Sequence, residues 1–215
     1  MATNLRNKKI LITAGPTWVA IDNVRVISNI ASGITGILLS EELRKQGARV
    51  TLVLGPVDCC CLNKGVRLIR YRYFDQLKRI IAKEAGSKKY DILIQTAAVS
   101  DYEPQNKFNG KISSGKKSLT LKLVPTAKII DIVKKKDPGI FLVGFKLEPQ
   151  AGRNRLLSSA SKLIDKTGSD LVVANTFKGN KYRAFIVDSK RIYASALNKT
   201  GLVRSLVKVL NAMYK

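Results

Sequence analysis

The sequence has 215 residues, of which 45% are hydrophobic and 25% are charged, fractions that are typical of a globular chain with one substantial core. No apolar run approaches the roughly 18–20 residues that a membrane-spanning helix requires, and residues 1–9 lack the apolar core of a secretion signal. Histidine is absent, which excludes histidine triads, histidine metal ligands and histidine general bases. We therefore expect one domain over residues 1–215, cytoplasmic and without a membrane partner.

The charge balance is strongly basic, because 39 Lys and Arg residues against 15 Asp and Glu residues give a formal net charge of +24. A field of this sign attracts nucleotides, phosphorylated metabolites and nucleic acids. The basic residues are spread along the chain without interleaved aromatic residues, so we expect no nucleic-acid partner; a nucleic-acid-binding module is the alternative that charge alone supports. The cysteines are consecutive, Cys59–Cys61, which favours neither a disulfide nor zinc, and we expect no metal site built from side chains.

Strand-like and helical segments alternate along the chain. Runs such as ILIT, VTLVL and DILIQTA are continuously apolar, as expected for strands covered on both faces. The pattern predicts an α/β, Rossmann-like, three-layer fold with a mostly parallel sheet and a C-terminal antiparallel hairpin, and the polar stretch 100–117 is expected to be a long functional loop. Strands are expected at 9–14, 49–54, 66–71, 90–96, 118–124, 140–145, 170–174, 183–188 and 191–195, and helices at 33–46, 74–86, 126–136, 152–167 and 201–214.

An unusually long loop follows the first predicted strand. Twelve residues, 15–26, separate that strand from the segment ISNIASGITG. The turn at residues 32–36 opens a helix whose backbone N–H groups can bind a phosphate, although a Ser32 helix cap with glycines for close packing explains the same pattern. Asn29 and Arg25 lie just before this turn, where loop hydrogen bonding and a surface charge are the simpler alternatives.

Three lysines also stand out by position. Lys111 lies in the polar stretch, and Lys162 and Lys166 are four residues apart, which places them on one face of the predicted helix. Ligands of parallel sheets bind beyond the carboxyl ends of the strands, which is where these segments are expected. For each lysine, solvated surface charge is the alternative.

Five segments in order resemble the phosphopantothenate–cysteine ligase family of coenzyme A biosynthesis, over nearly the whole chain from Lys9 to the last predicted helix. They are ILITAGPTWVAIDNVRVISNIASGITG, AAVSDY, GKISS, VGFKLE and DLVVAN. The resemblance implies joining of 4′-phosphopantothenate to L-cysteine, driven by CTP or ATP with Mg²⁺, through an acyl-nucleotidyl intermediate that forms with release of pyrophosphate. The 215 residues resemble the form of the family without a flavin-dependent decarboxylase domain.

The resemblance also implies roles for individual residues. Asn29 would hold the oxygen of the activated acyl group and orient it for cysteine, Arg25 would help to bind the phosphopantothenoyl intermediate, and Lys111 would reach the phosphates. The family also implies a homodimer with sites close to the subunit interface. The implied nucleotide-binding residues are Ser32, Gly33, Gly36, Gln95, Thr96, Ala97, Asp101, Lys111, Ala127, Lys128, Ile129, Ile130, Phe145, Lys162 and Lys166.

An NAD(P)-dependent reductase is the main alternative, because SGITGILLSEELRKQGARVTLV also resembles a dinucleotide-binding helix followed by a strand. Two features oppose it. The glycines do not follow the first strand directly, and Tyr90, Tyr102 and Tyr182 each lack a lysine four residues on.

Overall fold

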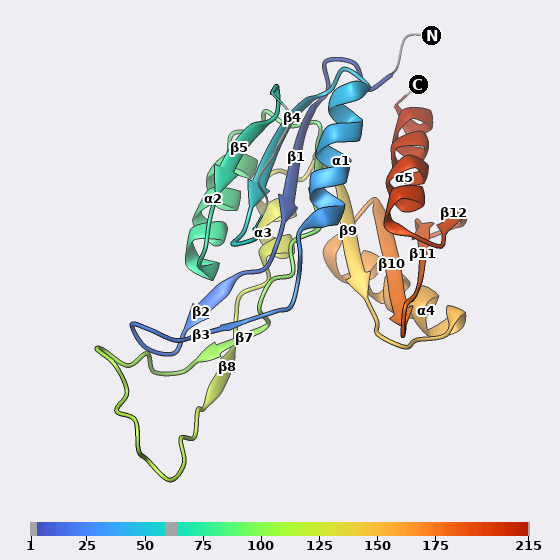
Figure 1. Cartoon of the computed structure of the whole chain (residues 1–215). Coiled ribbons are helices and arrows are strands. Elements are labelled where there is room, and N and C mark those ends of the chain that lie inside the picture. The colour runs from blue at the N-terminus through green and yellow to red at the C-terminus, as the bar shows by residue number, and fades with distance from the viewer. Residues whose placement is uncertain (1–3, 59–63, 215) are drawn as a thin grey trace.

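Figure 1 shows the computed structural model of the chain, which describes residues 4–58 and 64–214; the consecutive cysteines Cys59–Cys61 lie outside the described residues. The strands are β1 (Lys9–Ala14), β2 (Trp18–Ala20), β3 (Val26–Ser28), β4 (Arg49–Leu54), β5 (Arg67–Arg70), β6 (Ile92–Gln95), β7 (Tyr102–Pro104), β8 (Leu123–Pro125), β9 (Phe141–Leu147), β10 (Leu171–Lys178), β11 (Lys181–Val187) and β12 (Ile192–Ala196). The helices are α1 (Ile34–Lys45), α2 (Phe74–Gly86), α3 (Ile129–Lys136), α4 (Arg153–Thr167) and α5 (Lys199–Met213).

Eight strands form one sheet in the order β12-β11-β10-β9-β6-β1-β4-β5. The strands from β10 to β5 are parallel, and β11 and β12 extend the sheet as antiparallel strands. The chain builds the sheet from β1 towards β5 and then crosses to β6 on the other side of β1, so the strand order reverses between these two strands. The predicted fold class is confirmed, and ligands of such sheets bind at the crevice where the order reverses.

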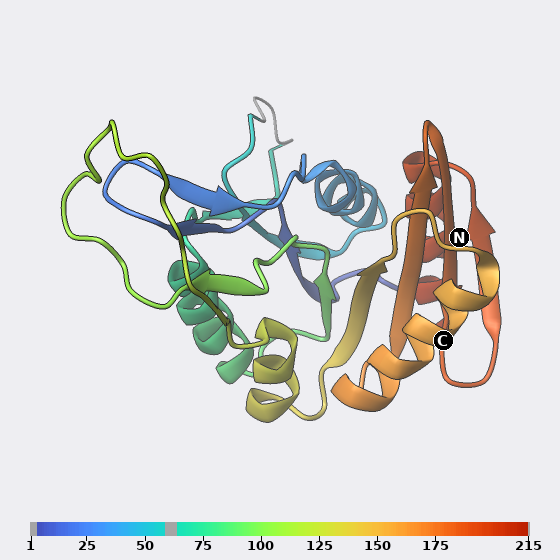
Figure 2. The same ribbon diagram turned by 90° about the horizontal axis from the view of Figure 1, so that it is seen from below.

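Both faces of the sheet are covered, which explains why the strands read as continuous apolar runs. Residues Ile10, Ile12 and Leu52 belong to the core under α1 and α5, whereas Leu11 and Leu93 belong to the core under α2 and α3. Helix α4 covers β10 and β11 on the same side as α2 and α3 (Figure 2). Among the described residues, no helix combines the length and the apolar character needed to cross a membrane.

Helix α1 packs directly against β1 because it carries glycine at the point of contact. A Cβ atom built on Gly36 would lie 2.4 Å from the Cβ of Ala14 and 2.7 Å from the Oγ1 of Thr96, distances that side chains do not tolerate. The glycine therefore sets how closely the helix approaches the strand. This close approach places the N-terminus of α1 beside the end of β1.

Two short antiparallel ribbons, β2–β3 and β7–β8, and the loop 105–122 form an arm that projects away from the sheet (Figures 1 and 2). The predicted strand 118–124 is wrong in extent, since only Leu123–Pro125 is strand and it pairs with β7 outside the main sheet. Leu119 and Leu123 alternate with polar residues as in a strand, but they are 44% and 43% exposed. No layer formed by the described residues covers them, so the alternating segment forms only a short ribbon.

Asp22 holds the arm together at the β2–β3 turn. Its buried carboxylate accepts the N–H of Ile112 at 3.0 Å and those of Val24 and Arg25 at 2.8 and 2.7 Å, and it pairs with the Arg25 guanidinium. The N–H of Ile112 contributes most to lowering the pKa of Asp22 to about 2, against the opposing effect of burial. Since the folded-state pKa lies below the ordinary 3.8, this stabilisation is complete above that pH and is lost as the pH falls through about 2.

The α1–β1 contact predicts an unusual response to a glycine-to-alanine change. We expect Gly36→Ala to lower the free energy of unfolding by about 1–3 kcal/mol, because overpacking outweighs the gain of about 1 kcal/mol in helix propensity. Urea denaturation measures the change. Gly86→Ala is the matched control, because its Cβ would meet nothing closer than a Lys136 side-chain carbon at 3.9 Å. Equal stability of the two variants would contradict the steric argument.

The anchoring of Ile112 predicts slow cleavage by trypsin after Lys111, because a protease must draw the adjacent backbone into its cleft. We expect Asp22→Asn to accelerate this cleavage about tenfold, since an amide cannot replace a carboxylate that accepts from three N–H groups and a guanidinium. Mass spectrometry of the fragments gives the rate, and cleavage after Lys116 serves as the internal reference. Asp165→Asn, on the exposed face of α4, is the control variant, and unchanged cleavage after Lys111 would show that Asp22 does not anchor the loop.

Candidate active site

A cavity of about 1300 Å³ opens at the carboxyl ends of β1, β6, β9 and β10. It lies where the order of the parallel strands reverses, as expected for a doubly wound sheet. Most of the nucleotide-binding residues that the family resemblance implied line it, together with the predicted catalytic residue Asn29. They are Asn29, Ser32, Gly33, Gln95, Thr96, Ala97, Asp101, Ala127, Lys128, Ile129, Ile130, Phe145, Lys162 and Lys166.

The N-terminus of α1 forms one end of the cavity. Gly33 caps the helix with a left-handed φ of 70°, a conformation that favours glycine, and a Cβ atom there would lie only 3.3 Å from the backbone nitrogen of Gly15. The alternative of a Ser32 cap is wrong, because the helix has no side-chain cap and Ser32 contacts only the N–H of Ile34, at 3.5 Å. The first turn carries no acidic residue, so its N–H groups and dipole remain suited to an anion.

Gly36 lies within α1 and does not line the cavity. Its position is explained by the contact with Ala14 and Thr96. The two glycines of this segment therefore have different roles. Gly33 caps the helix, and Gly36 allows the helix to pack closely against β1.

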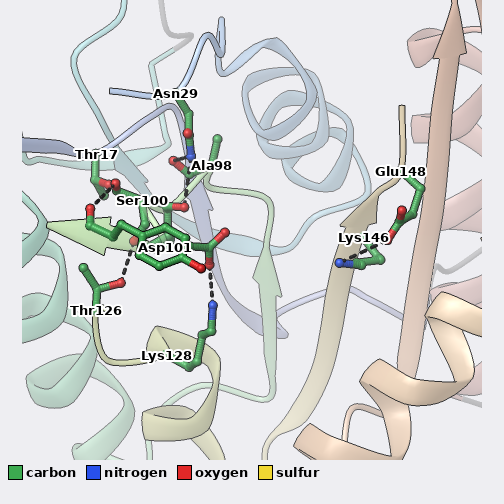
Figure 3. Close-up of polar contacts among 11 residues, drawn as sticks. Thr17, Asn29, Ala98, Ser100, Asp101, Thr126, Lys128, Lys146 and Glu148 are labelled. Atoms are coloured by element: carbon green, nitrogen blue, oxygen red, sulfur yellow. Dashed lines mark hydrogen bonds and ion pairs between the residues drawn. The ribbon is translucent and has the colours of Figure 1, made fainter. Parts of the chain in front are cut away.

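The segment that follows β6 forms the floor of the cavity and is held by hydroxyl groups (Figure 3). The N–H of Ser100 donates to Thr17 Oγ1 at 2.9 Å, and Thr126 Oγ1 donates to the carbonyl oxygen of Ser100 at 2.6 Å. Both threonines and Ser100 are buried. Residues far apart in sequence thus fix the backbone just before Asp101.

Asn29 reaches this floor from the loop before α1 (Figure 3). Its Nδ2 donates to the carbonyl oxygen of Ala98 at 3.2 Å and to that of Val99 at 3.0 Å. The residue itself is exposed and lines the cavity. The backbone of residues 98 and 99 therefore determines how the side chain of Asn29 is oriented.

Charged side chains on both walls are partly paired. Asp101 pairs with Lys128, the residue before α3, and Glu148 pairs with Lys146 at 3.2 Å (Figure 3). Burial raises the pKa of Glu148, but Lys146, with smaller contributions from Ser159 and Arg155, outweighs it. The net pKa lies below the usual range, and the carboxylate is ionised at neutral pH. These pairs offset the charges of Asp101 and Glu148, whereas Asp131, which also lines the cavity, has no lysine or arginine partner in the described part of the chain.

Three lysines of the cavity, Lys162, Lys166 and Lys199, have no acidic partner in the described part of the chain. The first two lie on the cavity face of α4, as the four-residue spacing predicted, and Lys199 is the first residue of α5. Unpaired ammonium groups around one cavity favour an anionic ligand. The residues 4–58 and 64–214 contain no group of three or more acidic, cysteine or histidine side chains placed to hold a metal ion.

Several residues that line the cavity on the side of β9 and β10 were not identified from the sequence. Lys146, Glu148, Ser159, Asn175, Phe177, Tyr182 and Lys199 also line the cavity. Lys146 and Glu148 were within reach of prediction, because they directly follow the core of a parallel strand. Phe177 and Tyr182 face each other across the β10–β11 pair, and β10 runs further than its apolar core indicated.

Arg25 and Lys111 lie in the arm and do not line this cavity. The Arg25 guanidinium pairs with Asp22 and also approaches the carbonyl oxygen of Ile112, while the N–H of Asn23 donates to the carbonyl oxygen of Gly110 at 3.0 Å. The two predicted residues are therefore neighbours of each other at the β2–β3 turn. The structure does not bring them to Asn29 within one copy of the chain.

Comparison with known proteins identifies relatives that cover most of this chain. The chain is 44% identical over 177 residues to the coenzyme A biosynthesis bifunctional protein CoaBC of Thermococcus kodakarensis, a match that covers 81% of this chain and 43% of that protein. The DNA/pantothenate metabolism flavoprotein of Streptococcus pneumoniae has a crystal structure with a TM-score of 0.86 and 29% identity, covering 96% of this chain and 99% of that one. A structure of a Cab2 variant in complex with phosphopantothenate-cysteine shares the fold, with a TM-score of 0.76, 17% identity, and coverage of 97% and 88%.

This chain thus spans less than half the length of the curated Thermococcus relative. The family model described as the DNA/pantothenate metabolism flavoprotein C-terminal domain matches residues 5–209, nearly the whole chain. The chain belongs to the DNA/pantothenate metabolism flavoprotein C-terminal domain family.

Proposed function

We propose that this chain is a phosphopantothenate–cysteine ligase of coenzyme A biosynthesis. It would join 4′-phosphopantothenate to L-cysteine at the expense of CTP or ATP. The observation that carries the proposal is the cavity at the reversal of strand order, where an anchored Asn29, a helix N-terminus and unpaired lysines face one space. The names of the Thermococcus relative and of the Cab2 complex support the same reaction.

The proposed reaction has two steps. A carboxylate oxygen of phosphopantothenate attacks the α-phosphorus of the nucleotide, and the bond to pyrophosphate breaks. The cysteine amine then attacks the acyl carbon and displaces the nucleoside monophosphate. Both steps need positioned charges more than a side-chain nucleophile, which suits a chain without histidine.

The phosphates would lie between α1 and α4. The N–H groups at the start of α1 would bind phosphate oxygens, and Lys162 and Lys166 would offset charge from the opposite wall. Phe145 would lie beside the base. We expect Mg²⁺ to arrive with the triphosphate and to be held mainly by phosphate oxygens, since Asp101 and Glu148 are already paired with lysines.

We further propose a homodimer in which the arm of one copy reaches the cavity of the other. Lys111 and Arg25 lie outside the cavity of their own chain, and their loop is tied to Asp22. Exposed apolar side chains on the arm offer a surface for a second copy. They are Val24 at 65%, Tyr102 at 54%, Leu119 at 44%, Leu123 at 43% and Phe108 at 42% exposure.

A pyrophosphate-release assay with phosphopantothenate and each of the four nucleoside triphosphates tests the ligase. We expect release with CTP or ATP, formation of the amide product only when cysteine is added, and no activity without Mg²⁺. The same assay distinguishes CTP from ATP as the cosubstrate. The absence of pyrophosphate release with all four nucleotides would contradict the proposal, and nicotinamide binding in a fluorescence titration would favour the reductase instead.

Lys111 gives a sharper test of the first step. We expect Lys111→Gln to slow acyl-nucleotide formation about 100-fold, because one cation that stabilises the developing phosphate charge is lost. Single-turnover pyrophosphate release measures this step. Lys116→Gln, in the same loop, is the matched control and should retain the rate. A normal rate in Lys111→Gln would remove this lysine from the mechanism.

Mixing two inactive variants tests the homodimer. If each site takes Asn29 from one copy and Lys111 from the other, a mixed dimer of Asn29→Ala and Lys111→Gln has one site with both native residues. We expect an equimolar mixture, after subunit exchange, to recover roughly a quarter of the wild-type activity. No recovery despite measured exchange would place both residues in the site of one chain.

A further inference from the structure

The side-chain amide of Asn29 is fixed in one orientation. Its Nδ2 lies 3.2 Å from the carbonyl oxygen of Ala98 and 3.0 Å from that of Val99 (Figure 3). An amide nitrogen has two hydrogens, and the two carbonyls account for both. The flipped orientation would bring Oδ1 equally close to two carbonyl oxygens, which repel it. The hydrogen-bond partners therefore determine which terminal atom of the side chain is Nδ2 and which is Oδ1.

The two carbonyl groups are themselves held in place. The N–H of Ala98 donates to the carbonyl oxygen of Gly15 at 3.0 Å, and the N–H of Ser100 donates to Thr17 Oγ1 at 2.9 Å. Ala98 also forms a β-bridge with Pro16. The backbone on both sides of Val99 is thus tied to the loop after β1, and the orientation of the amide follows from a rigid support.

The side-chain oxygen Oδ1 is the atom of Asn29 that remains available to bind a ligand. Asn29 Oδ1 accepts no hydrogen bond from the residues that the structure describes, and the side chain lines the cavity. An amide oxygen can only accept. A ligand group that binds there must therefore bring a hydrogen, whereas the acyl oxygen and the phosphates of the proposed intermediate are acceptors.

Given the proposed ligase function, on which this inference rests, we propose that Asn29 Oδ1 accepts a hydrogen bond from the attacking amine of cysteine. Asn29 then positions the nucleophile instead of holding the acyl oxygen, the role that the family resemblance implied. The amine is the one reacting group of the second step that carries a hydrogen at the reacting atom. The acyl oxygen must obtain its donors from other groups around the cavity.

The chemistry of the second step makes such a contact effective. The lone pair of the neutral amine attacks the acyl carbon, the bond from that carbon to the phosphate oxygen breaks, and the nucleoside monophosphate leaves with the electron pair. The nitrogen becomes positively charged as its bond to carbon forms, and its extra proton then passes to the leaving phosphate or to water. The hydrogen bond to Oδ1 strengthens as this charge develops, so it stabilises the transition state more than the bound amine.

A nucleophile without an N–H group separates the two roles of Asn29. Enzyme-bound acyl-nucleotide, formed from phosphopantothenate and CTP or ATP, is mixed with cysteine or with 2-mercaptoethanol, whose thiolate attacks without donating a hydrogen. We expect Asn29→Ala to slow amide formation from cysteine about 100-fold, while thioester formation and the initial pyrophosphate release change less than about threefold. Asn154→Ala, on the exposed first turn of α4, is the matched control and should leave all three rates unchanged.

The outcomes are distinguishable. Equal slowing of the reactions with cysteine and with 2-mercaptoethanol would overturn the inference, because loss of an acyl-oxygen contact affects every nucleophile alike. Failure of the wild-type protein to form any acyl-nucleotide would overturn the proposed function and the inference with it. If Asn29→Ala does not fold, Asn29→Ser provides the same comparison, because its shorter side chain cannot span from the two carbonyls to the nucleophile.

Discussion

The contact between Gly36 of α1 and Ala14 of β1 is the constraint on which the rest of the site depends. With no side chain at Gly36, the helix lies close enough for Gly33 to meet the backbone of Gly15. The helix N-terminus therefore points at the end of the first strand, next to the position where the strand order reverses. A side chain at Gly36 would require the helix or the strand to shift, because its Cβ would lie 2.4 Å from the Cβ of Ala14.

Pairing of charges gives the cavity its chemical character more than the net charge of +24 does. Asp101 and Glu148 are each neutralised by a lysine, whereas Lys162, Lys166 and Lys199 have no acidic partner in the described segments. Unpaired cations in a concave site act on a ligand through a lower effective dielectric than cations on open surface. Most of the excess positive charge lies outside the cavity and is not concentrated around a concave site.

The sequence was sufficient to predict the layers of the fold and most of the cavity lining. Continuous apolar runs predicted the parallel strands, and the resemblance placed Asn29, Asp101 and Phe145 in one site. Strands of three residues, such as β2 and β7, are too short to show a recognisable alternation of apolar and polar residues in the sequence. The orientation of the Asn29 amide was also beyond sequence reasoning, because its partners lie 69 and 70 residues away in the chain.

Contacts at the β2–β3 turn keep the arm apart from the cavity of its own chain. The N–H of Ile112 donates to the carboxylate of Asp22, and the N–H of Asn23 donates to the carbonyl oxygen of Gly110, so a swing of the loop that carries Lys111 into the cavity of the same chain would have to break its contacts with the β2–β3 turn. Breaking these contacts is costly, since the buried carboxylate would lose the N–H of Ile112 and keep only the donors of its own turn, Val24 and Arg25. A second copy that brings its own intact arm avoids this cost, and the exposed Val24 and Phe108 would gain cover in the same event. The anchoring that keeps the arm apart from its own cavity thus favours a site completed by two chains.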